Sequence, residues 1–257
     1  MLTFVGLGLY DERSITRRGR EAVTAAEAVF AEFYTSKLAG ATVADIEAAH
    51  GVDVEVRDRA GVEQDPDPIL QAASEGEAAF LVAGDPMIST THVDLRLRAH
   101  ERGIETRVIH GTTAQTAASS LTGLQNYRFG KATTLPFERS HGGDGVPDSI
   151  LETVAANRER GLHTLAYLDI DRAADEYMTG DSAARRLVAA GETGLAVVVG
   201  QAGSDDPTVV ADRLSALRER SFGPPLHLLV LPGELHPIER DALRALAGAP
   251  ESTLRET

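Results

Sequence analysis

The stretch Leu2-Thr3-Phe4-Val5-Gly6-Leu7-Gly8 decides the fold class. Its short apolar run predicts a buried strand over residues 2–6. Glycines directly after a strand let backbone N–H groups approach a ligand closely. A plain tight turn accounts for the two glycines equally well, so the turn needs support from the rest of the chain.

Working outward from this turn, strands alternate with helices as far as residue 110. We predict strands over residues 2–6, 28–32, 52–56, 78–83 and 106–109, and helices over 16–25, 42–50, 69–73 and 91–102. This alternation predicts a parallel sheet that binds ligands at the carboxyl ends of its strands.

The pattern changes after His110-Gly111. We predict strands over residues 133–135, 164–170, 195–199 and 227–231, and helices over 113–121, 149–160, 182–190, 210–220 and 236–247. The expected fold is therefore α/β with two domains, the first over residues 1–110 with a mainly parallel sheet and the second over 112–257 with a mixed sheet. We expect a cofactor cleft between them. The glycine-rich loop over 138–147 fits a mobile cover and a plain surface loop equally well.

Charge is the unusual feature of the composition. The 257 residues carry a formal net charge of −14, and Lys37 and Lys131 are the only lysines. High salt screens the self-repulsion of such a surface, because the Debye length falls from about 8 Å at physiological ionic strength to about 3 Å near 1 M. We therefore predict a halophilic protein, with an acidic mesophilic enzyme as the alternative.

The composition also excludes several kinds of partner. The chain has no cysteine, which excludes disulfides, thiolate metal ligands and cysteine nucleophiles. No basic stripe is visible that would neutralise nucleic-acid phosphates. The first residues do not form a signal peptide, and no apolar run is long enough to cross a bilayer. We expect a cytoplasmic protein that binds neither nucleic acid nor membrane.

Two common nucleotide-binding motifs are not matched. A dinucleotide-binding turn would carry a third glycine where this chain has Asp11. The segment Phe129-Gly130-Lys131-Ala132 lacks the spacing and the hydroxyl of a phosphate-binding loop. The sequence therefore supports neither a nicotinamide site nor a nucleoside-triphosphate site.

The segment Gly84-Asp85-Pro86 follows the predicted strand over residues 78–83. A doubly wound sheet binds its ligand at this end of its strands. Asp85 has two possible roles here. It could accept hydrogen bonds from a hydroxyl or amine of a ligand, or it could cap the helix that starts nearby.

Six segments along the chain together carry a resemblance to a known family. They are Gly6-Leu7-Gly8-Leu9-Tyr10-Asp11-Glu12-Arg13, Phe30-Ala31-Glu32-Phe33-Tyr34-Thr35-Ser36, Gly84-Asp85-Pro86 with Thr90-Thr91-His92, Gly161-Leu162-His163-Thr164 with Leu168-Asp169-Ile170, Gln201-Ala202-Gly203-Ser204, and His227 with Leu231-Pro232-Gly233-Glu234-Leu235-His236. In this order they resemble the diphthine synthases. The match is more specific than the glycine turn and Gly-Asp-Pro segment shared by the wider class of tetrapyrrole-methylase-like methyltransferases.

The resemblance implies an activity and a cofactor. Diphthine synthases use S-adenosylmethionine to methylate the amino group of 2-(3-amino-3-carboxypropyl)histidine on translation elongation factor 2. The product is diphthine, an intermediate of diphthamide biosynthesis, and archaeal members are expected to add three methyl groups. The family implies a homodimer of two-domain subunits.

The resemblance also implies the cofactor contacts, carried over motif by motif: Leu9, Asp85, Ile88, Thr113, Ala114, Leu168, Ala202 and His227. The pair Thr113-Ala114 lies where this chain departs from the family, which commonly has His-Ala-Pro-Ser in place of His110-Gly111-Thr112-Thr113. Without the family, Ile88 and Leu168 would be core residues and His227 a buried core histidine.

No residue is assigned a catalytic role, and no metal site is predicted, because the histidines lack ligand spacing with carboxylates. Tyr10, Phe33 and Tyr34 are candidates to surround the methylated amine, since aromatic faces attract cations. Two other functions stay open. One is a methyltransferase acting on a tetrapyrrole precursor or a ribosomal RNA, and the other is a non-catalytic regulator that binds S-adenosylmethionine.

Overall fold

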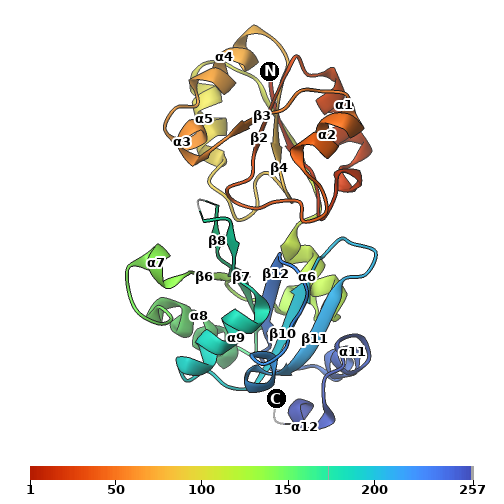
Figure 1. The fold of residues 1–257 in the computed structure, drawn as a ribbon, viewed down its shortest axis with the longest axis vertical. Helices are drawn as coiled ribbons and strands as arrows, with labels where there is room; N and C mark the ends of the chain where they lie inside the picture. The colour runs from red at the N-terminus through yellow and green to blue at the C-terminus, as the bar shows by residue number, and fades with distance from the viewer. Residues whose placement is uncertain (173, 256–257) are drawn as a thin grey trace. The chain divides into compact units, whose positions relative to one another are not determined.

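The computed structural model describes residues 1–172 and 174–255. The chain divides into two compact units, Met1–Thr113 and Ala114–Thr257, and each has its own central sheet (Figure 1). Among the described residues, no helix is long and apolar enough to cross a membrane.

Unit 1 is built on a five-stranded sheet in the order β3-β2-β4-β1-β5, and all four strand pairs are parallel. Its strands are β1 (Leu2–Gly6), β2 (Ala28–Glu32), β3 (Glu55–Arg57), β4 (Ala78–Val82) and β5 (Thr106–Ile109). The predicted parallel sheet is confirmed. Because β1 pairs with both β4 and β5, the carboxyl ends of these three strands lie side by side.

Helices cover both faces of this sheet (Figure 1). They are α1 (Arg17–Ala25), α2 (Val43–His50), α3 (Arg59–Glu63), α4 (Asp67–Glu75) and α5 (Val93–Glu101), with a 3-10 turn η1 (Glu12–Ser14). Val23 of α1 and Ile46 of α2 pack with Val5 on one face. Leu70 of α4 and Leu95 of α5 pack on the other face.

Local capping explains where the first two helices begin. The Thr16 side chain accepts a hydrogen bond from Gly19 N, which caps α1. Thr42 and Asp45 form a reciprocal capping box at the start of α2. The short helix α3 was not predicted, because five residues are too few to show a helical period.

Unit 2 contains a mixed sheet in the order β11-β10-β12-β7-β6. Its strands are β6 (Thr133–Leu135), β7 (Thr164–Leu168), β10 (Leu195–Gly200), β11 (Thr208–Arg213) and β12 (His227–Leu231), and β8 (Ile170–Asp171) with β9 (Glu176–Tyr177) forms a separate hairpin. The pair β6 and β7 is parallel, and the other three pairs are antiparallel. The predicted mixed sheet is confirmed.

Helices also cover both faces of the second sheet. They are α6 (Ala114–Thr122), α7 (Glu138–His141), α8 (Asp148–Glu159), α9 (Gly180–Ala189), α10 (Leu214–Leu217), α11 (Pro237–Ala247) and α12 (Glu251–Leu254), with a 3-10 turn η2 (Asn126–Arg128). Val154 of α8 and Leu187 of α9 pack on one face. Ala118 of α6 and Leu243 of α11 pack on the other.

The helix predicted over residues 210–220 is wrong. Its first residues belong to β11, which runs antiparallel to β10 with Val199 opposite Val209, and only the single turn α10 follows. The β-branched residues Thr208-Val209-Val210 favour a strand, and pairing with β10 outweighs the apolar spacing further along.

The glycine-rich loop over residues 138–147 is held by side chains at both ends. Glu138 begins the short helix α7 and accepts a hydrogen bond from Gly145 N at 3.3 Å. Arg186 of α9 donates to the carbonyl oxygen of Gly145 at 2.7 Å. Through these two hydrogen bonds the loop is held against α7 and α9 of unit 2.

Candidate functional site

Four glycines form a close-packed edge at the carboxyl ends of β1, β4 and β5. Gly8 and Gly84 exchange backbone hydrogen bonds of 3.2 and 2.7 Å, and both have a left-handed backbone with φ of 76° and 80°. A Cβ atom would lie 2.6 Å from Gly84 O if added to Gly6, and 2.2 Å from it if added to Gly111. Only glycine permits this approach of three chain segments.

The Asp85 side chain connects the segments that form this edge through its hydrogen bonds. Its carboxylate is buried, and Oδ1 accepts a hydrogen bond from Met87 N at 2.9 Å. Oδ2 lies 2.7 Å from His110 Nδ1 and accepts a hydrogen bond from Gly111 N at 3.3 Å. Asp85 therefore closes its own turn and joins the ends of β4 and β5. It does not cap α5, which begins eight residues further on.

The other cofactor contacts predicted in unit 1 lie near the same edge. Leu9 follows the Gly8 turn, and its carbonyl accepts a hydrogen bond from Asp11 N at 3.0 Å. The Cα atom of Thr113 lies 4.0 Å from where a Cβ atom of Gly84 would be. Ile88 is 45% exposed, so it is not a core residue and presents an apolar surface after the Gly-Asp-Pro turn.

Three of the four contacts predicted in unit 2 lie at the same strand ends of the second sheet. Leu168 ends β7 and is buried in the core, as expected without the family. Ala202 follows the end of β10, and His227 begins β12 directly opposite Gly200. The remaining contact, Ala114, begins α6 and packs against the same apolar cluster as Ala202.

His227 presents a buried hydrogen-bond donor. Its Nδ1 accepts a hydrogen bond from Gly180 N at 3.0 Å, so in the neutral ring Nε2 carries the proton. Nε2 is buried and makes no well-aligned hydrogen bond among the described residues, although the backbone carbonyls of Phe222 and Pro224 lie close enough to the ring to favour its charged form. Burial lowers the pKa of His227, which keeps the ring neutral near pH 7. An unpaired buried N–H group is costly, which favours a ligand that accepts its hydrogen bond.

The three aromatic candidates differ in their surroundings. The guanidinium carbon of Arg59 lies 4.9 Å from the centre of the Tyr34 ring, so a cation already covers one face of that ring. Phe33 packs against the core on the α1 and α2 face. The Tyr10 ring lies against Gly40, where an added Cβ atom would come within 2.5 Å of it. Tyr34 is therefore the least suited of the three to hold a methylated amine.

A second buried pair, His163 and Glu239, has a structural role in unit 2. His163 Nε2 lies 3.1 Å from Glu239 Oε1, and Glu239 also accepts hydrogen bonds from Gln125 N and His236 N at 2.9 and 2.8 Å. These bonds fix the start of α11. His163 comes just before β7, whereas Leu168 lies at the other end of that strand.

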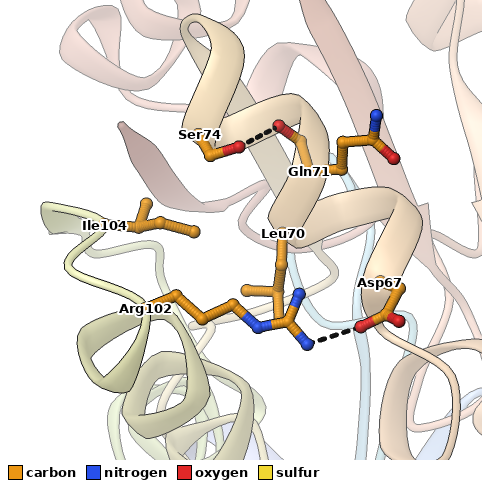
Figure 2. Close-up of a pocket in the computed structure, with 6 residues that line it drawn as sticks. All are labelled: Asp67, Leu70, Gln71, Ser74, Arg102 and Ile104. Carbon is orange, nitrogen blue, oxygen red and sulfur yellow. Dashed lines mark hydrogen bonds and ion pairs between the residues drawn. The ribbon is translucent and has the colours of Figure 1, made fainter.

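A surface groove lies away from the glycine edge. Figure 2 shows its lining residues on α4 and just before β5: Asp67, Leu70, Gln71, Ser74, Arg102 and Ile104. Arg102 is ion-paired with Asp67, and Ile104 precedes the first residue of β5, at the opposite end from His110. None of the predicted cofactor contacts lines this groove. Among the described residues there is also no cluster of three or more side chains that could hold a metal ion.

Comparison with known proteins identifies the class. Residues 1–218 match the family of Tetrapyrrole (Corrin/Porphyrin) Methylases, so the chain is a methyltransferase of this class. Diphthine synthases from Natronomonas pharaonis and Halorubrum lacusprofundi are each 66% identical to it, over 99% and 100% of the chain and 98% and 100% of their own lengths. The chain belongs to the diphthine synthase family.

Solved structures agree with this assignment. A crystal structure of diphthine synthase matches with a TM-score of 0.92 and 38% identity, covering 100% of this chain and 99% of that one. A putative diphthine synthase from Entamoeba histolytica matches with a TM-score of 0.84 and 32% identity, over 97% and 99%. The predicted resemblance and the two-sheet α/β fold are confirmed. The relatives from halophilic archaea also agree with the predicted adaptation to salt.

Two residues of the glycine edge received no role from the sequence. His110 and Gly111 were treated only as a domain junction, yet both bind the Asp85 carboxylate. Their position directly after β5 was the available signal, because the carboxyl ends of neighbouring parallel strands meet at one edge.

Proposed function

We propose that this chain transfers methyl groups from S-adenosylmethionine to the amino group of 2-(3-amino-3-carboxypropyl)histidine on translation elongation factor 2. The product is diphthine, with three methyl groups on the amine. The observation that carries the proposal is the 66% identity with diphthine synthases over the full length of the chain.

We propose that the eight residues named from the sequence hold the cofactor: Leu9, Asp85, Ile88, Thr113, Ala114, Leu168, Ala202 and His227. Two features support the fit. Ile88 offers an exposed apolar side chain next to the glycine edge, which suits an adenine or methionine moiety. His227 offers a buried N–H group without a partner among the described residues, which suits an acceptor atom of the cofactor. When bound, S-adenosylmethionine supplies a methyl group on a sulfonium, which is already a good leaving group.

The chain's own task in this reaction is mainly to position the reactants. Holding an amine in line with the methyl group contributes roughly 7–11 kcal/mol. Deprotonating an amine with a pKa about 1 to 3 units above neutrality costs only about 1.4–4 kcal/mol. Positioning is the larger effect, so the reaction does not require a dedicated general base, and we assign none.

The experiment incubates the protein, in concentrated KCl, with methyl-labelled S-adenosylmethionine and elongation factor 2 from cells that lack this enzyme. We expect label on the modified histidine of the factor, located by mass spectrometry of its peptides. No label at that histidine would overturn the proposal. Label on a ribosomal RNA or a tetrapyrrole would assign the chain to another substrate, and cofactor binding with no transfer to any of them would indicate a regulator.

The rest of the proposal concerns the state of the protein in the cell. We propose a cytoplasmic homodimer whose partner is elongation factor 2 and which binds no nucleic acid. Membership of the diphthine synthase family supports the cytoplasmic homodimer and the partner, and the net charge of −14 argues against nucleic-acid binding. Light scattering in concentrated salt would measure the oligomeric state.

A further inference from the structure

Glu32 and His92 form a buried pair near the glycine edge of unit 1. Both side chains are fully buried, and His92 Nε2 lies 3.5 Å from Glu32 Oε1. Glu32 is the last residue of β2, and His92 directly precedes α5. Burying two ionisable groups carries a desolvation cost, which only good compensating contacts offset. Neither residue belongs to the cofactor contacts proposed above.

The contacts of this pair connect two loops. Glu32 Oε2 accepts hydrogen bonds from Tyr34 N and Thr35 N at 2.9 and 3.0 Å, which fixes the loop after β2. His92 Nδ1 lies 3.1 Å from the carbonyl oxygen of Pro86, in the turn after β4. The pair therefore links the β2 loop to the turn that carries Asp85 and Ile88.

The position of one proton follows from these partners. A carbonyl oxygen only accepts hydrogen bonds, so Nδ1 of His92 carries a proton. Nε2 faces Glu32 Oε1 at 3.5 Å without a well-formed hydrogen bond, and Oε1 also accepts a hydrogen bond from the Thr35 hydroxyl. The two buried side chains lie against each other and each bonds one of the two loops, so together they can hold both loops in a fixed geometry.

We propose that His92 is a positioning residue for the cofactor. Through the Pro86 carbonyl it holds the Asp85–Ile88 turn, and through Glu32 it anchors that turn to the loop after β2. Because Ile88 is an exposed side chain on this turn, its place depends on the backbone that His92 holds. This inference rests on the proposed cofactor contacts of Asp85 and Ile88.

The test replaces His92 with phenylalanine, which keeps a ring for the edge-on contact with Phe80 and removes both nitrogens. In His92→Phe we expect amide hydrogen exchange over residues 87–91, measured without ligand, to become about ten-fold faster. We expect the Kd for S-adenosylhomocysteine to rise about ten-fold, which is about 1.4 kcal/mol. His92→Asn keeps a donor near the Nδ1 position, so it should restore slow exchange over the same residues.

Two further variants separate this role from general destabilisation. His50 is a buried histidine of α2 whose ring nitrogens have no hydrogen-bond partner among the described residues, so His50→Phe is a matched ring replacement. It should leave exchange over 87–91 and the Kd unchanged. Glu32→Gln can donate to Nε2 and still accept from Tyr34 N and Thr35 N, so it should keep the turn fixed, whereas Glu32→Leu should release it.

Unchanged exchange over 87–91 in a folded His92→Phe protein would overturn the inference, and so would an equal change in His50→Phe. Circular dichroism shows that each variant is folded. The exchange measurement needs neither cofactor nor elongation factor 2, so a chain that proved to act on another substrate would still give a clear result for His92.

Discussion

At the scale of single residues, His227 combines two hydrogen-bonding roles in one ring. Its Nδ1 satisfies the buried Gly180 N–H group, while its Nε2–H has no partner among the described residues. The first contact supports the fold, and the second nitrogen, near the carbonyls of Phe222 and Pro224, is the one a ligand could engage. A substitution that keeps one nitrogen position and removes the other can therefore separate stability from binding.

His227→Asn is expected to retain an acceptor for Gly180 N and to lose the donor at the Nε2 position. We expect the Kd for S-adenosylhomocysteine to rise about ten-fold, which is about 1.4 kcal/mol, and calorimetric titration would measure it. His227→Ala also leaves Gly180 N unsatisfied, which should lower the free energy of unfolding by about 1–3 kcal/mol more. Equal affinity in the parent and in His227→Asn would contradict a role for Nε2 in binding.

The sequence predicted some of these residues better than others. It correctly placed Asp85 at the carboxyl ends of the strands of the first sheet, because the Gly-Asp-Pro segment follows a strong strand pattern. It could not show that His110 and Gly111 bind the same carboxylate, since this contact joins residues 25 and 26 positions apart. Ile88 differs from the expectation without the family, because an apolar side chain alone indicates a core position and the structure exposes it.

At the scale of elements, the glycine edge is a contact between backbones. A Cβ atom on Gly111 would lie 2.2 Å from Gly84 O and 2.9 Å from Gly8 N. Backbone atoms held by hydrogen bonds to a neighbouring segment cannot turn aside as the end of a flexible side chain can. The ends of β1, β4 and β5 therefore depend on glycine at this point.

Gly111→Ala is expected to lower the free energy of unfolding by roughly 1–3 kcal/mol, the usual cost of overpacking, and to weaken cofactor binding. Thermal melting and calorimetric titration would measure the two effects. Gly143→Ala is the matched control, because its nearest neighbour would be the flexible His141 side chain at 3.2 Å. A melting temperature for Gly111→Ala equal to that of the control would contradict this view of the edge.

The sequence predicted most elements because their local signals agree with their packing. The strands β1, β2, β5, β6 and β12 have the predicted boundaries. The errors lie where pairing with a distant segment decides the structure. Strand β11 is the clearest example, since its partner β10 outweighs the helix-like spacing of the leucines that follow it.

At the scale of the whole molecule, buried histidines make stability depend on pH. Burial lowers the pKa of both His163 and His227 below the ordinary value of about 6.5. Below that value the unfolded chain binds protons that the folded chain does not. The free energy of unfolding therefore decreases as the pH falls.

We expect a loss of about 1.4 kcal/mol per pH unit for each of these histidines, over the window from pH 6.5 down to the folded-state pKa. Urea unfolding at a series of pH values, in one concentrated KCl solution, would measure this slope. His227→Asn should reduce it by one histidine's contribution. A free energy of unfolding that stays constant from about pH 7 to about pH 5.5 would contradict the prediction.

Net charge should make stability rise with salt. The chain has 39 acidic and 25 basic side chains, so repulsion among carboxylates is not balanced by ion pairs. Raising KCl from about 0.15 M to about 1 M shortens the Debye length from about 8 Å to about 3 Å. We expect a higher melting temperature in the concentrated salt and no equal gain from an uncharged osmolyte at matched water activity. A melting temperature that falls with KCl would contradict adaptation to salt.

The pairing of β1 has a consequence for the order of events during synthesis. Among the strands of unit 1 this strand is made before its partners, because its two neighbours are β4 and β5, whose residues begin 76 and 104 positions later. Closing such long loops is slow, so β1 emerges from the ribosome well before it can pair. The hairpin of β10 and β11 joins segments close in the chain and needs no such wait. The sheet of unit 1 can therefore form only after residues 78–109 have been made, and until then the apolar residues of β1 lack their partner strands.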